Sequence, residues 1–358
     1  MLSPENTIQE SLELLEALLC VQAYSGEEQD KADLLMKTLQ SWGYTPKRQG
    51  NNVWLEHHPE NTSKTLWFHS HIDTVKPAEG WISNPFGGQW NKKKLTALGS
   101  NDAGASVVSM LAAFRILVQE EVPLNLIWVA GAEEENSGKG GVDSMLASLP
   151  EADLVLVGEP TGMQAAVAER GLIVIDGVVK GIAGHAARNE GINAIYEALE
   201  DIRFFQNYRF EKVSDTLGPV SMNLTVIEAG EKHNSVPDAC RYTVDIRLNE
   251  HYTHHEVLEE LQSHCKGTLK VRSERLKASG TPTNHAVFKV LDKMGISSYG
   301  SPTLSDWSLI PYPAVKIGPG DSARSHTAEE YILQNEIEDA VPLYVELIKT
   351  WIDEETME

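Results

Sequence analysis

Three polar side chains, His69, His71 and Asp73, occupy alternate positions of the apolar run "LWFHSHIDTV" at residues 66–75. Alternate side chains of a strand share one face, so all three point the same way if the segment is extended throughout. Imidazoles and a carboxylate on one face can hold a metal ion. A histidine beside a carboxylate in a strand is, however, more often a hydrogen-bonded structural pair. This stretch alone therefore leaves both interpretations open.

Similar residues follow three further apolar runs. They are the acidic residues 133–135 after "LIWVAG", Glu159 after "LVLVG", and His326 after "AVKIGPG" and a short loop. Each has an ordinary alternative, because adjacent glutamates usually lie on solvated surface and "GEPTG" or "SNDAGAS" can be simple turns. In open α/β sheets, sites form outside the carboxyl ends of the strands, so these groups would meet there. Their joint position at strand ends favours a functional site.

The elements that must position these residues can be read from the hydrophobic periodicity. Ser3 followed by Pro4 predicts a helix start, and Ser25 with Glu28 predicts a capping box that opens a second helix ending near Gly43. Strands and helices then alternate, with strands at 52–58, 64–70, 124–132 and 152–160 and helices after 101–106 and through 141–149. This alternation predicts an α/β sheet covered on both faces.

The order of predicted strands and helices changes from about Gly171. Strands at 173–181, 220–230, 240–248 and 269–276 and helices at 192–205 and 256–264 give the order β-α-β-β-α-β, the split βαβ pattern. The alternation of strands and helices returns after about residue 280, with a helix near 285–294 and a long final helix from about Ala328. We therefore predict a discontinuous domain of residues 1–170 and 281–358 and an inserted domain of residues 171–280.

Composition restricts the class of protein. The chain of 358 residues carries a formal charge of −22 and has no basic stretch, which argues against nucleic acid or an anionic membrane as partner. No segment was expected to span a membrane, and the N-terminus lacks the pattern of a signal peptide, so a cytoplasmic protein is expected. Its three cysteines are far apart, which disfavours disulfides and thiolate zinc sites. Any metal would need histidine and carboxylate ligands.

The ordered set of motifs resembles one known family, that of the co-catalytic zinc aminoacylases and carboxypeptidases. Within it, the chain is most similar to the branch of acetylornithine deacetylase, succinyl-diaminopimelate desuccinylase and the acyl-lysine deacylases. The resemblance runs from about Ser25 to the final helix. It is carried by "SHIDTV", "GSNDAG", "GAEEENSGKGG", "GEPT", "GIAGHAARNEGINAI", "HNSVPDACRYTVDIR" and "GPGDSARSHTAEEY". It implies a mixed-sheet zinc-hydrolase domain with an inserted ferredoxin-like lid or dimerisation domain.

The same resemblance implies a pair of metal ions, with zinc as the first expectation and cobalt as the alternative. His71 and Glu159 would bind one ion, Glu135 and His326 the other, and Asp102 would bridge them. Two histidines and three carboxylates suit such divalent ions, and three negative charges offset most of the +4 of the pair. The family also implies a cis peptide bond just after Asp102.

Roles for the neighbouring residues follow from the same match. Asp73 would orient the ligand histidine, whereas His69 lies at a position that the motif does not fix and is interpreted as a wall residue or helper. Glu134 would be the general base and Glu133 would take a variable acidic place. The implied reaction is hydrolysis of an amide, in which Glu134 takes a proton from an activated water and returns it to the leaving amine.

Three residues of the inserted domain complete the predicted site. The resemblance implies that His185 stabilises the oxyanion across a homodimer, and that Asn234 and Arg247 hold substrate, although a lone histidine is usually structural and Arg247 could instead form an interdomain ion pair. The chain departs from its relatives at "TLSDWS", where Trp307 follows Ser305 and Asp306, so the substrate pocket is expected to differ.

The predicted function is removal of the acyl group from a small-molecule N-acyl amino acid. N-acetyl-ornithine or an acyl-citrulline in arginine biosynthesis comes first. The alternatives are an N-succinyl amino acid desuccinylase, an acyl-lysine deacylase and, less favoured, a dipeptidase. An acyl-lysine deacylase acting on an acidic carrier protein would have to overcome the repulsion of a −22 chain. A binding protein without catalysis is the alternative outside this class, but such a protein need not retain Glu134 and all five ligands.

Overall fold

The computed structural model describes residues 3–60, 62–188 and 190–357. The chain forms two compact units. The first contains Met1–Val167, Thr281–Tyr299 and Ile310–Glu358, and the second contains Ala168–Gly280 and Gly300–Leu309. The short stretch Gly300–Leu309 thus groups with the second unit, whereas the sequence prediction assigned all of residues 281–358 to the first.

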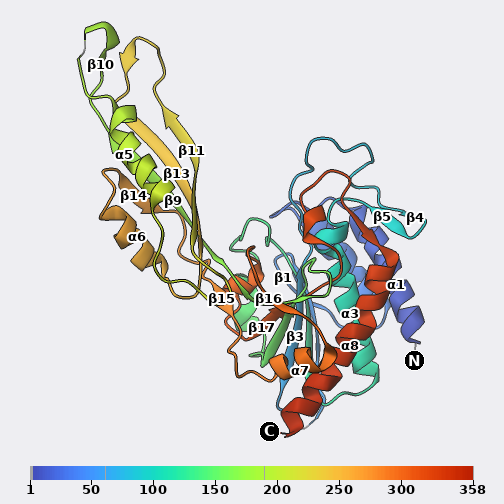
Figure 1. The fold of residues 1–358 in the computed structure, drawn as a ribbon. Helices are drawn as coiled ribbons and strands as arrows, with labels where there is room; N and C mark the ends of the chain where they lie inside the picture. The colour runs from blue at the N-terminus through green and yellow to red at the C-terminus, as the bar shows by residue number, and fades with distance from the viewer. Residues whose placement is uncertain (1–2, 61, 189, 358) are drawn as a thin grey trace. The chain divides into compact units, whose positions relative to one another are not determined.

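The sheet of the first unit has four parallel strands at its centre, in the order β6 (Asn125–Gly131), β3 (Thr65–His71), β7 (Leu154–Val157) and β17 (Ala314–Lys316). Antiparallel strands flank them (Figure 1). On one side these are β2 (Asn52–His57) and β1 (Lys47–Gln49), and on the other β8 (Ala165–Glu169), with β15 (Ser279–Gly280) and β16 (Ser298–Ser301) paired to it. Every residue of β3 is buried, so both faces of the sheet are covered at its centre. The prediction of a mixed α/β sheet is confirmed.

The first unit contains six α-helices among its described residues, of which α3 is the buried central one. They are α1 (Pro4–Leu19), α2 (Gln29–Ser41), α3 (Ala105–Gln119), α4 (Val142–Met145), α7 (Val287–Met294) and α8 (Gln334–Met357). Helix α3 contacts β3 and β6 and packs against both α1 and α8 (Figure 1). The residues Ser100–Gln119 form a segment long and apolar enough to cross a membrane, contrary to expectation, but 89% of its apolar window is buried inside the protein. That burial is typical of a core helix.

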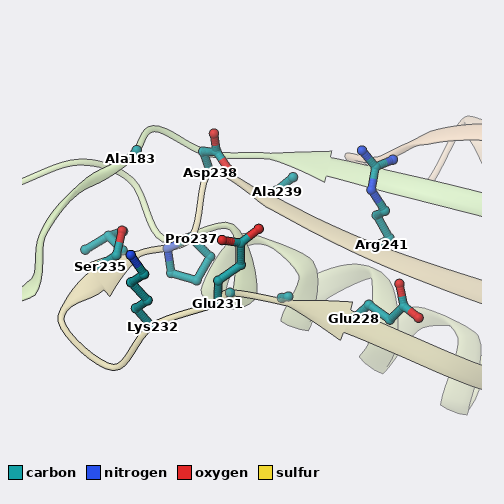
Figure 2. A pocket seen from close by; sticks show the side chains of 12 residues that line it. Ala183, Glu228, Glu231, Lys232, Ser235, Pro237, Asp238, Ala239 and Arg241 are labelled. Atoms are coloured by element: carbon teal, nitrogen blue, oxygen red, sulfur yellow. The ribbon is translucent and has the colours of Figure 1, made fainter.

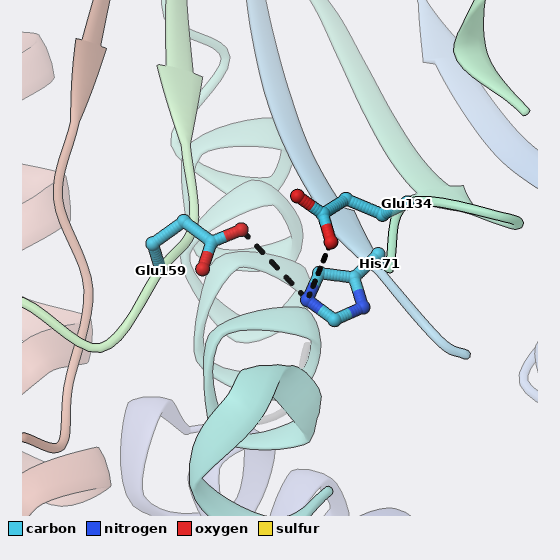
Figure 3. Close-up of side chains that lie close together, drawn as sticks. All are labelled: His71, Glu134 and Glu159. Carbon is cyan, nitrogen blue, oxygen red and sulfur yellow. Dashed lines mark ion pairs between the residues drawn. The ribbon is translucent and has the colours of Figure 1, made fainter. Parts of the chain in front are cut away.

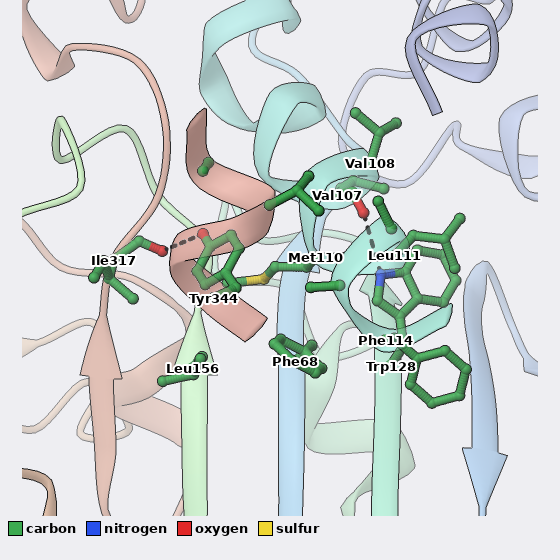
Figure 4. Close-up of a cluster of buried hydrophobic side chains, with 14 of the residues drawn as sticks. Phe68, Val107, Val108, Met110, Leu111, Phe114, Trp128, Leu156, Ile317 and Tyr344 are labelled. Atoms are coloured by element: carbon green, nitrogen blue, oxygen red, sulfur yellow. Dashed lines mark hydrogen bonds between the residues drawn. The ribbon is translucent and has the colours of Figure 1, made fainter. Parts of the chain in front are cut away.

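Two large aromatic side chains in the core between α3, α8 and the sheet, Trp128 and Tyr344, have hydrogen-bond partners inside the core (Figure 4). The indole nitrogen of Trp128 donates to the carbonyl oxygen of Val107 at 3.1 Å, and the hydroxyl of Tyr344 donates to the carbonyl oxygen of Ile317 at 2.8 Å. A buried donor without a partner costs about 1–3 kcal/mol. These bonds therefore let large aromatic side chains fill the core and brace β6 and β17, two of the strands that lead to the site.

Two predicted helix starts differ from the structure. Helix α2 begins at Gln29 without a side-chain cap, because Ser25 and Glu28 bond elsewhere and form no capping box. Helix α8 begins at Gln334, later than predicted, because strand β18 (Tyr331–Leu333) pairs with β5 (Lys94–Thr96), which pairs in turn with β4 (Trp90–Asn91). The predicted helix at 141–149 is only the short α4, followed by a 3₁₀ turn.

The second unit is the predicted β-α-β-β-α-β arrangement. Its elements are β9 (Gly171–Lys180), α5 (Ala194–Asn207), β11 (Ser221–Ala229), β13 (Ala239–Leu248), α6 (His254–Gln262) and β14 (Thr268–Val271). The antiparallel sheet has the order β11-β13-β9-β14, and the burial of β9 alternates from one residue to the next. A separate ribbon pairs β10 (Gly184–His185) with β12 (Ser235–Val236).

Candidate active site

The carboxyl ends of the four parallel strands carry the predicted metal ligands of the first unit. His71 is the last residue of β3, the acidic residues 133–135 follow β6, Glu159 follows β7, and His326 lies in the loop after β17. Neighbouring parallel strands end at one edge of the sheet, so residues far apart in sequence meet there.

Asp102 lies between the two histidines. Its Oδ1 is 3.2 Å from Nε2 of His71, and its Oδ2 is 3.7 Å from Nε2 of His326. One carboxylate thus presents a different oxygen to each imidazole, which is the arrangement that a bridging ligand requires. The peptide bond between Asp102 and Ala103 is cis, as the resemblance implied.

The glutamates complete two groups of donors. Nε2 of His71 lies 3.7 Å from Oε1 of Glu159 and 3.9 Å from Oε2 of Glu134 (Figure 3). Nε2 of His326 lies 3.0 Å from Oε2 of Glu135. Donor atoms of His71, Glu134 and Glu159 all lie within 4.8 Å of one another, and so do those of His71, Asp102 and Glu135.

The charges of these groups perturb one another strongly. Burial lowers the pKa of His71, but the carboxylates around it, Glu134 and Asp102 first, outweigh burial and raise that pKa well above its ordinary value. Burial and the charge of Asp102 raise the pKa of Glu159 to about 8. The hydrogen bond with Glu135 is the main cause that raises the pKa of His326 to about 9. The raised pKa values of His71 and His326 reflect the carboxylates around them, whose negative charge favours a bound cation.

The donor set fits two divalent ions. Imidazole nitrogens and carboxylate oxygens are the ligands that zinc and similar ions take when thiolates are absent, and the three cysteines, Cys20, Cys240 and Cys265, belong to neither donor group. Asp102 faces both histidines, and each histidine has a glutamate of its own within 4 Å. The described residues therefore supply an assembled cluster of ligands at this sheet edge.

Asp73 fixes the geometry around His71. Strand β3 ends at His71, so Asp73 lies beyond the strand, yet its Oδ1 is 3.4 Å from Nδ1 of His71. Its carboxylate also accepts the backbone N–H groups of Glu134 and Glu135, each at 3.1 Å, and the hydroxyl of Ser25 at 2.7 Å. Burial raises its pKa, but the hydrogen bond and charge of His71 and the other donors bring that pKa below its ordinary value. A single carboxylate thus holds both the ligand histidine and the acidic turn.

His69 has a different environment from His71. It lies inside β3, with Val129 and Val157 as its neighbours in the sheet, and only 1% of it is exposed. It belongs to neither group of clustered donors.

Other polar residues tie the loops of the site together, and the sequence reasoning did not identify them. The hydroxyl of Ser70 donates to the carbonyl oxygen of Gly158 at 2.8 Å. The side chain of Asn101 bonds the backbone of Asp321 in both directions, at 2.9 and 3.1 Å. Ser70 precedes His71 in "SHIDTV", and Asn101 precedes Asp102 in "GSNDAG". This position next to a predicted ligand is the sequence feature that points to a role in the site.

Glu330 is a further such residue. Its carboxylate accepts the backbone N–H groups of Asn101 and Asp102, at 2.9 and 3.0 Å. Burial, and then the charge of Asp102, raise the pKa of Glu330 to about 7. The segment that carries Asp102 is thus anchored to the segment that follows His326.

The second unit carries the other predicted site residues. His185 and Asn234, far apart in sequence, lie close together, because His185 pairs with Ser235 in the β10–β12 ribbon and Ala186 donates to the carbonyl oxygen of Asn234 at 3.2 Å. Both side chains are exposed. The structure therefore brings these two residues together on one ribbon.

A pocket of about 600 Å³ adjoins this ribbon (Figure 2). It is lined by acidic and basic side chains, among them Glu228, Lys232 and Arg241, together with Ser235 of β12. Neither His185 nor Asn234 belongs to its lining. Its charges are mixed, so it shows no preference for one kind of ligand.

Arg247 and Trp307 have partners within the second unit. Nε and Nη2 of Arg247 donate to the two oxygens of Asp245, at 2.8 and 3.0 Å, so within its own unit Arg247 has an ion-pair partner two residues away on β13. Trp307 is 2% exposed, and it therefore packs in an interior rather than lining an open pocket. Ser305 beside it donates to Oε2 of Glu169 at 2.7 Å.

Replacing Asp102 with alanine tests the metal cluster directly. Because Asp102 faces both histidines, the substitution is expected to reduce bound zinc from two ions per chain to fewer than one after dialysis against metal-free buffer. Zinc per chain is measured by atomic emission, with Asp321→Ala as the control on the neighbouring loop. Two tightly retained ions in Asp102→Ala would contradict the bridging assignment.

Comparison with known proteins agrees with this geometry. Residues 67–350 match the sequence profile of peptidase family M20/M25/M40. The chain is 28% identical over 276 residues to succinyl-diaminopimelate desuccinylase 2 of Ruegeria sp., covering 71% of this chain and 69% of that protein. It is 26% identical over 303 residues to acetylornithine deacetylase of Proteus mirabilis, covering 78% of each.

Solved structures share the fold. A tripeptidase of Staphylococcus aureus superposes with a TM-score of 0.77 at 19% identity, covering 96% of this chain and 98% of that one. The YXEP protein of Bacillus subtilis, described as a dinuclear metal-binding peptidase of the M20 family, superposes with a TM-score of 0.73 at 15% identity, covering 98% and 99%. With the family match extending over most of the chain and the assembled ligand cluster, the chain belongs to peptidase family M20/M25/M40 and is a metal-dependent hydrolase.

Proposed function

We propose that the chain hydrolyses the amide bond of an N-acyl amino acid, with N-acetyl-ornithine or an acyl-citrulline as the first candidate substrate, in arginine biosynthesis. The observation that carries the proposal is the cluster in which Asp102 faces His71 and His326 while Glu134 and Glu135 share one turn beside them. The matches to an acetylornithine deacetylase and a succinyl-diaminopimelate desuccinylase support an acylated amino acid as substrate.

In this proposal five residues would hold two zinc ions: His71 and Glu159 would contribute to one, Glu135 and His326 to the other, and Asp102 to both. Ions bound there supply Lewis-acid polarisation of the acyl carbonyl and lower the pKa of a water molecule. Glu134 takes the proton of the attacking water and returns it to the nitrogen of the leaving amine. Its Oε2 lies 3.9 Å from Nε2 of His71, so Glu134 is close enough to the ligand cluster to reach a water molecule held there.

The remaining roles belong to the second unit. We propose that His185 donates a hydrogen bond to the oxyanion that forms when water adds to the carbonyl carbon, and that Asn234 helps to hold the substrate. Their common place on one ribbon supports a joint role. Arg247 would bind the substrate carboxylate as a fork, and it would have to exchange its contact with Asp245 to do so.

Removal of a succinyl group is the second candidate, because a desuccinylase matches the chain at 28% identity. A succinyl group is an acetyl group extended by a carboxymethyl group, so a site for succinyl needs an additional cationic partner for that carboxylate. The two possibilities can be separated by kinetics. Location in the cytoplasm stays a prediction.

A substrate panel tests the proposed function. The zinc-loaded protein is expected to release the amine from N-acetyl-ornithine with a kcat/KM at least about tenfold above that for N-succinyl-ornithine, N-succinyl-diaminopimelate and simple dipeptides, since a misfitting polar group costs at least ~1.4 kcal/mol of transition-state binding. The free amino acid is separated from each substrate by chromatography and quantified. Preference for a succinyl substrate would select the second candidate, and activity on dipeptides alone would refute both.

We also propose a homodimer formed through the second unit. Among the described residues, the exposed large apolar side chains all lie in this unit except Ile82. Tyr196 and Leu199 of α5 are 69% and 39% exposed, and Val226 and Ile227 of the edge strand β11 are 45% and 50% exposed. An edge strand with free pairing capacity beside apolar side chains is a surface on which two copies can associate. Sedimentation analysis measures the state directly.

A further inference from the structure

Glu28 is a fully buried carboxylate that the predicted site did not include. Its exposed fraction is 0%, although an ionised side chain is rarely buried without partners. It has three: Oε1 accepts the backbone N–H of Gly26 at 2.6 Å and that of Glu133 at 3.1 Å, and Oε2 accepts Nδ2 of Asn51 at 2.8 Å. Glu28 thus connects the start of α2, the loop before β2 and the acidic turn.

The acidic turn at residues 133–135 needs such support. Glu133 has a φ of +57°. Residues other than glycine adopt this backbone conformation only where the surrounding structure enforces it. The three consecutive backbone N–H groups of this turn go to two buried carboxylates: Glu133 to Glu28, and Glu134 and Glu135 to Asp73. Fixing all three N–H groups fixes the direction in which the side chain of Glu134 leaves the backbone.

A buried cation accompanies the two carboxylates. Lys31 is 4% exposed, its Nζ donates to the carbonyl oxygen of Ile72 at 3.1 Å, and it interacts electrostatically with both Asp73 and Glu28. The positive charge of Lys31 thus interacts with the same two carboxylates that accept the N–H groups of the acidic turn. The three residues Glu28, Lys31 and Asp73 form a network beneath the turn, which we name the turn anchor.

We propose that Glu28 is a positioning residue for Glu134: its carboxylate holds the strained backbone at Glu133 so that the carboxylate of Glu134 stays at the place where proton transfer occurs. This inference rests on the proposed role of Glu134 as general base. Displacing a reacting group by about 1 Å can cost up to 10²-fold in rate, so a hydrogen bond remote from substrate can carry a kinetic effect.

The substitution Glu28→Gln tests the idea because it keeps the shape of the side chain but sets an amide N–H₂ against Nδ2 of Asn51, donor to donor. Steady-state kinetics should show kcat lowered by about tenfold or more with KM within about twofold, since only positioning is lost. Zinc per chain should stay at the wild-type value. The control Glu27→Gln, at an exposed neighbouring position, should leave both parameters unchanged.

Two further variants separate positioning from a merely structural effect. Combining Glu28→Gln with Asn51→Asp exchanges donor and acceptor, restores the hydrogen bond and keeps the total charge, so kcat should return to within about threefold of wild type. In a protein that already carries Glu134→Gln, adding Glu28→Gln should cost less than about twofold, because the residue that Glu28 positions no longer acts.

Each outcome decides the proposal. Wild-type kcat in Glu28→Gln, no recovery in the exchange variant, or the same loss with and without Glu134→Gln would each overturn it. If Glu134→Gln itself keeps full turnover, Glu134 is not the general base and the proposed function is wrong. This result differs from the three outcomes above, which concern Glu28 alone. Should circular dichroism show that Glu28→Gln does not fold, Asn51→Ala removes the donor to Oε2, leaves Glu28 in place and is read by the same criteria.

Discussion

Replacement of Glu134 by glutamine is expected to lower kcat by at least about 10²-fold, the usual scale for loss of a positioned acid-base group, with two zinc ions still bound. The amide has the size and shape of the carboxylate, but it cannot take a proton from water at neutral pH. The five proposed ligands are untouched, so the loss reports proton transfer and not metal binding. Single-turnover kinetics and zinc analysis on the same sample measure the two properties.

The matched control is Glu133→Gln, one residue earlier in the same turn. Oε2 of Glu133 accepts the backbone N–H of Gly140 at 3.0 Å, and its carboxylate lies so close to Gly138 and Gly140 that a Cβ atom at either glycine would collide with it. The side chain of Glu133 is therefore used within its own loop. The amide oxygen of glutamine can still accept from Gly140, so we expect kcat within about threefold of wild type.

The comparison of the two variants fixes the register of the acidic turn. If Glu133→Gln is as damaging as Glu134→Gln, or more so, the assignment of the base is wrong by one residue. If Glu134→Gln instead loses zinc, Glu134 is a ligand, a possibility that its distance of 3.9 Å from Nε2 of His71 makes worth measuring.

Replacement of His185 by alanine is expected to lower kcat by about 10²–10³-fold, the cost of one oxyanion donor. If the donor comes from the second subunit, two inactive proteins can complement each other. A heterodimer of one His185→Ala protomer and one Glu134→Gln protomer has one site in which an intact Glu134 meets the partner's His185. Such a heterodimer, co-expressed and purified through two different tags, should show about half the activity of a wild-type dimer.

The control heterodimer carries both substitutions on one protomer and none on the other. With a shared site it should be nearly inactive, because the wild-type protomer receives the substituted residue of its partner and the other protomer lacks its base. If each chain uses its own His185, this control keeps about half the activity and the first heterodimer has almost none. The two models thus predict opposite results for the same pair of samples.

Two segments with the same capping-box pattern form different hydrogen bonds in the structure. The S-x-x-E spacing of Ser25 and Glu28 fits a capping box, and so does the T-x-x-E spacing of Thr253 and Glu256. Only the second pair forms one, with Glu256 and Thr253 bonded in both directions. Ser25 instead donates to Asp73. The local pattern is the same in both places, and the difference lies in which distant polar groups come near.

The ion pair of Arg247 with Asp245 can be predicted from the sequence. Residues two apart in a strand share a face, so "DIR" already places Asp245 beside Arg247. The burial of Trp307 offered no such signal, because burial depends on how the stretch Gly300–Leu309 packs against a unit that lies mostly earlier in the chain.

The sequence by itself determined the succession of strands and helices, the inserted β-α-β-β-α-β unit, and the strand ends at which His71, Glu135, Glu159 and His326 meet. These follow from hydrophobic periodicity and from the rule that parallel strands end at one edge, both of which are local or topological. Only the tertiary structure decided which polar groups hold that edge together. The bonds of Glu28 to Glu133, Asp73 to Glu134, and Glu330 to Asp102 span 105, 61 and 228 residues. A buried carboxylate accepts hydrogen bonds from backbone N–H groups that have no other acceptor in the folded chain. Which of these N–H groups lie near it depends on the tertiary structure, and no local sequence pattern encodes this.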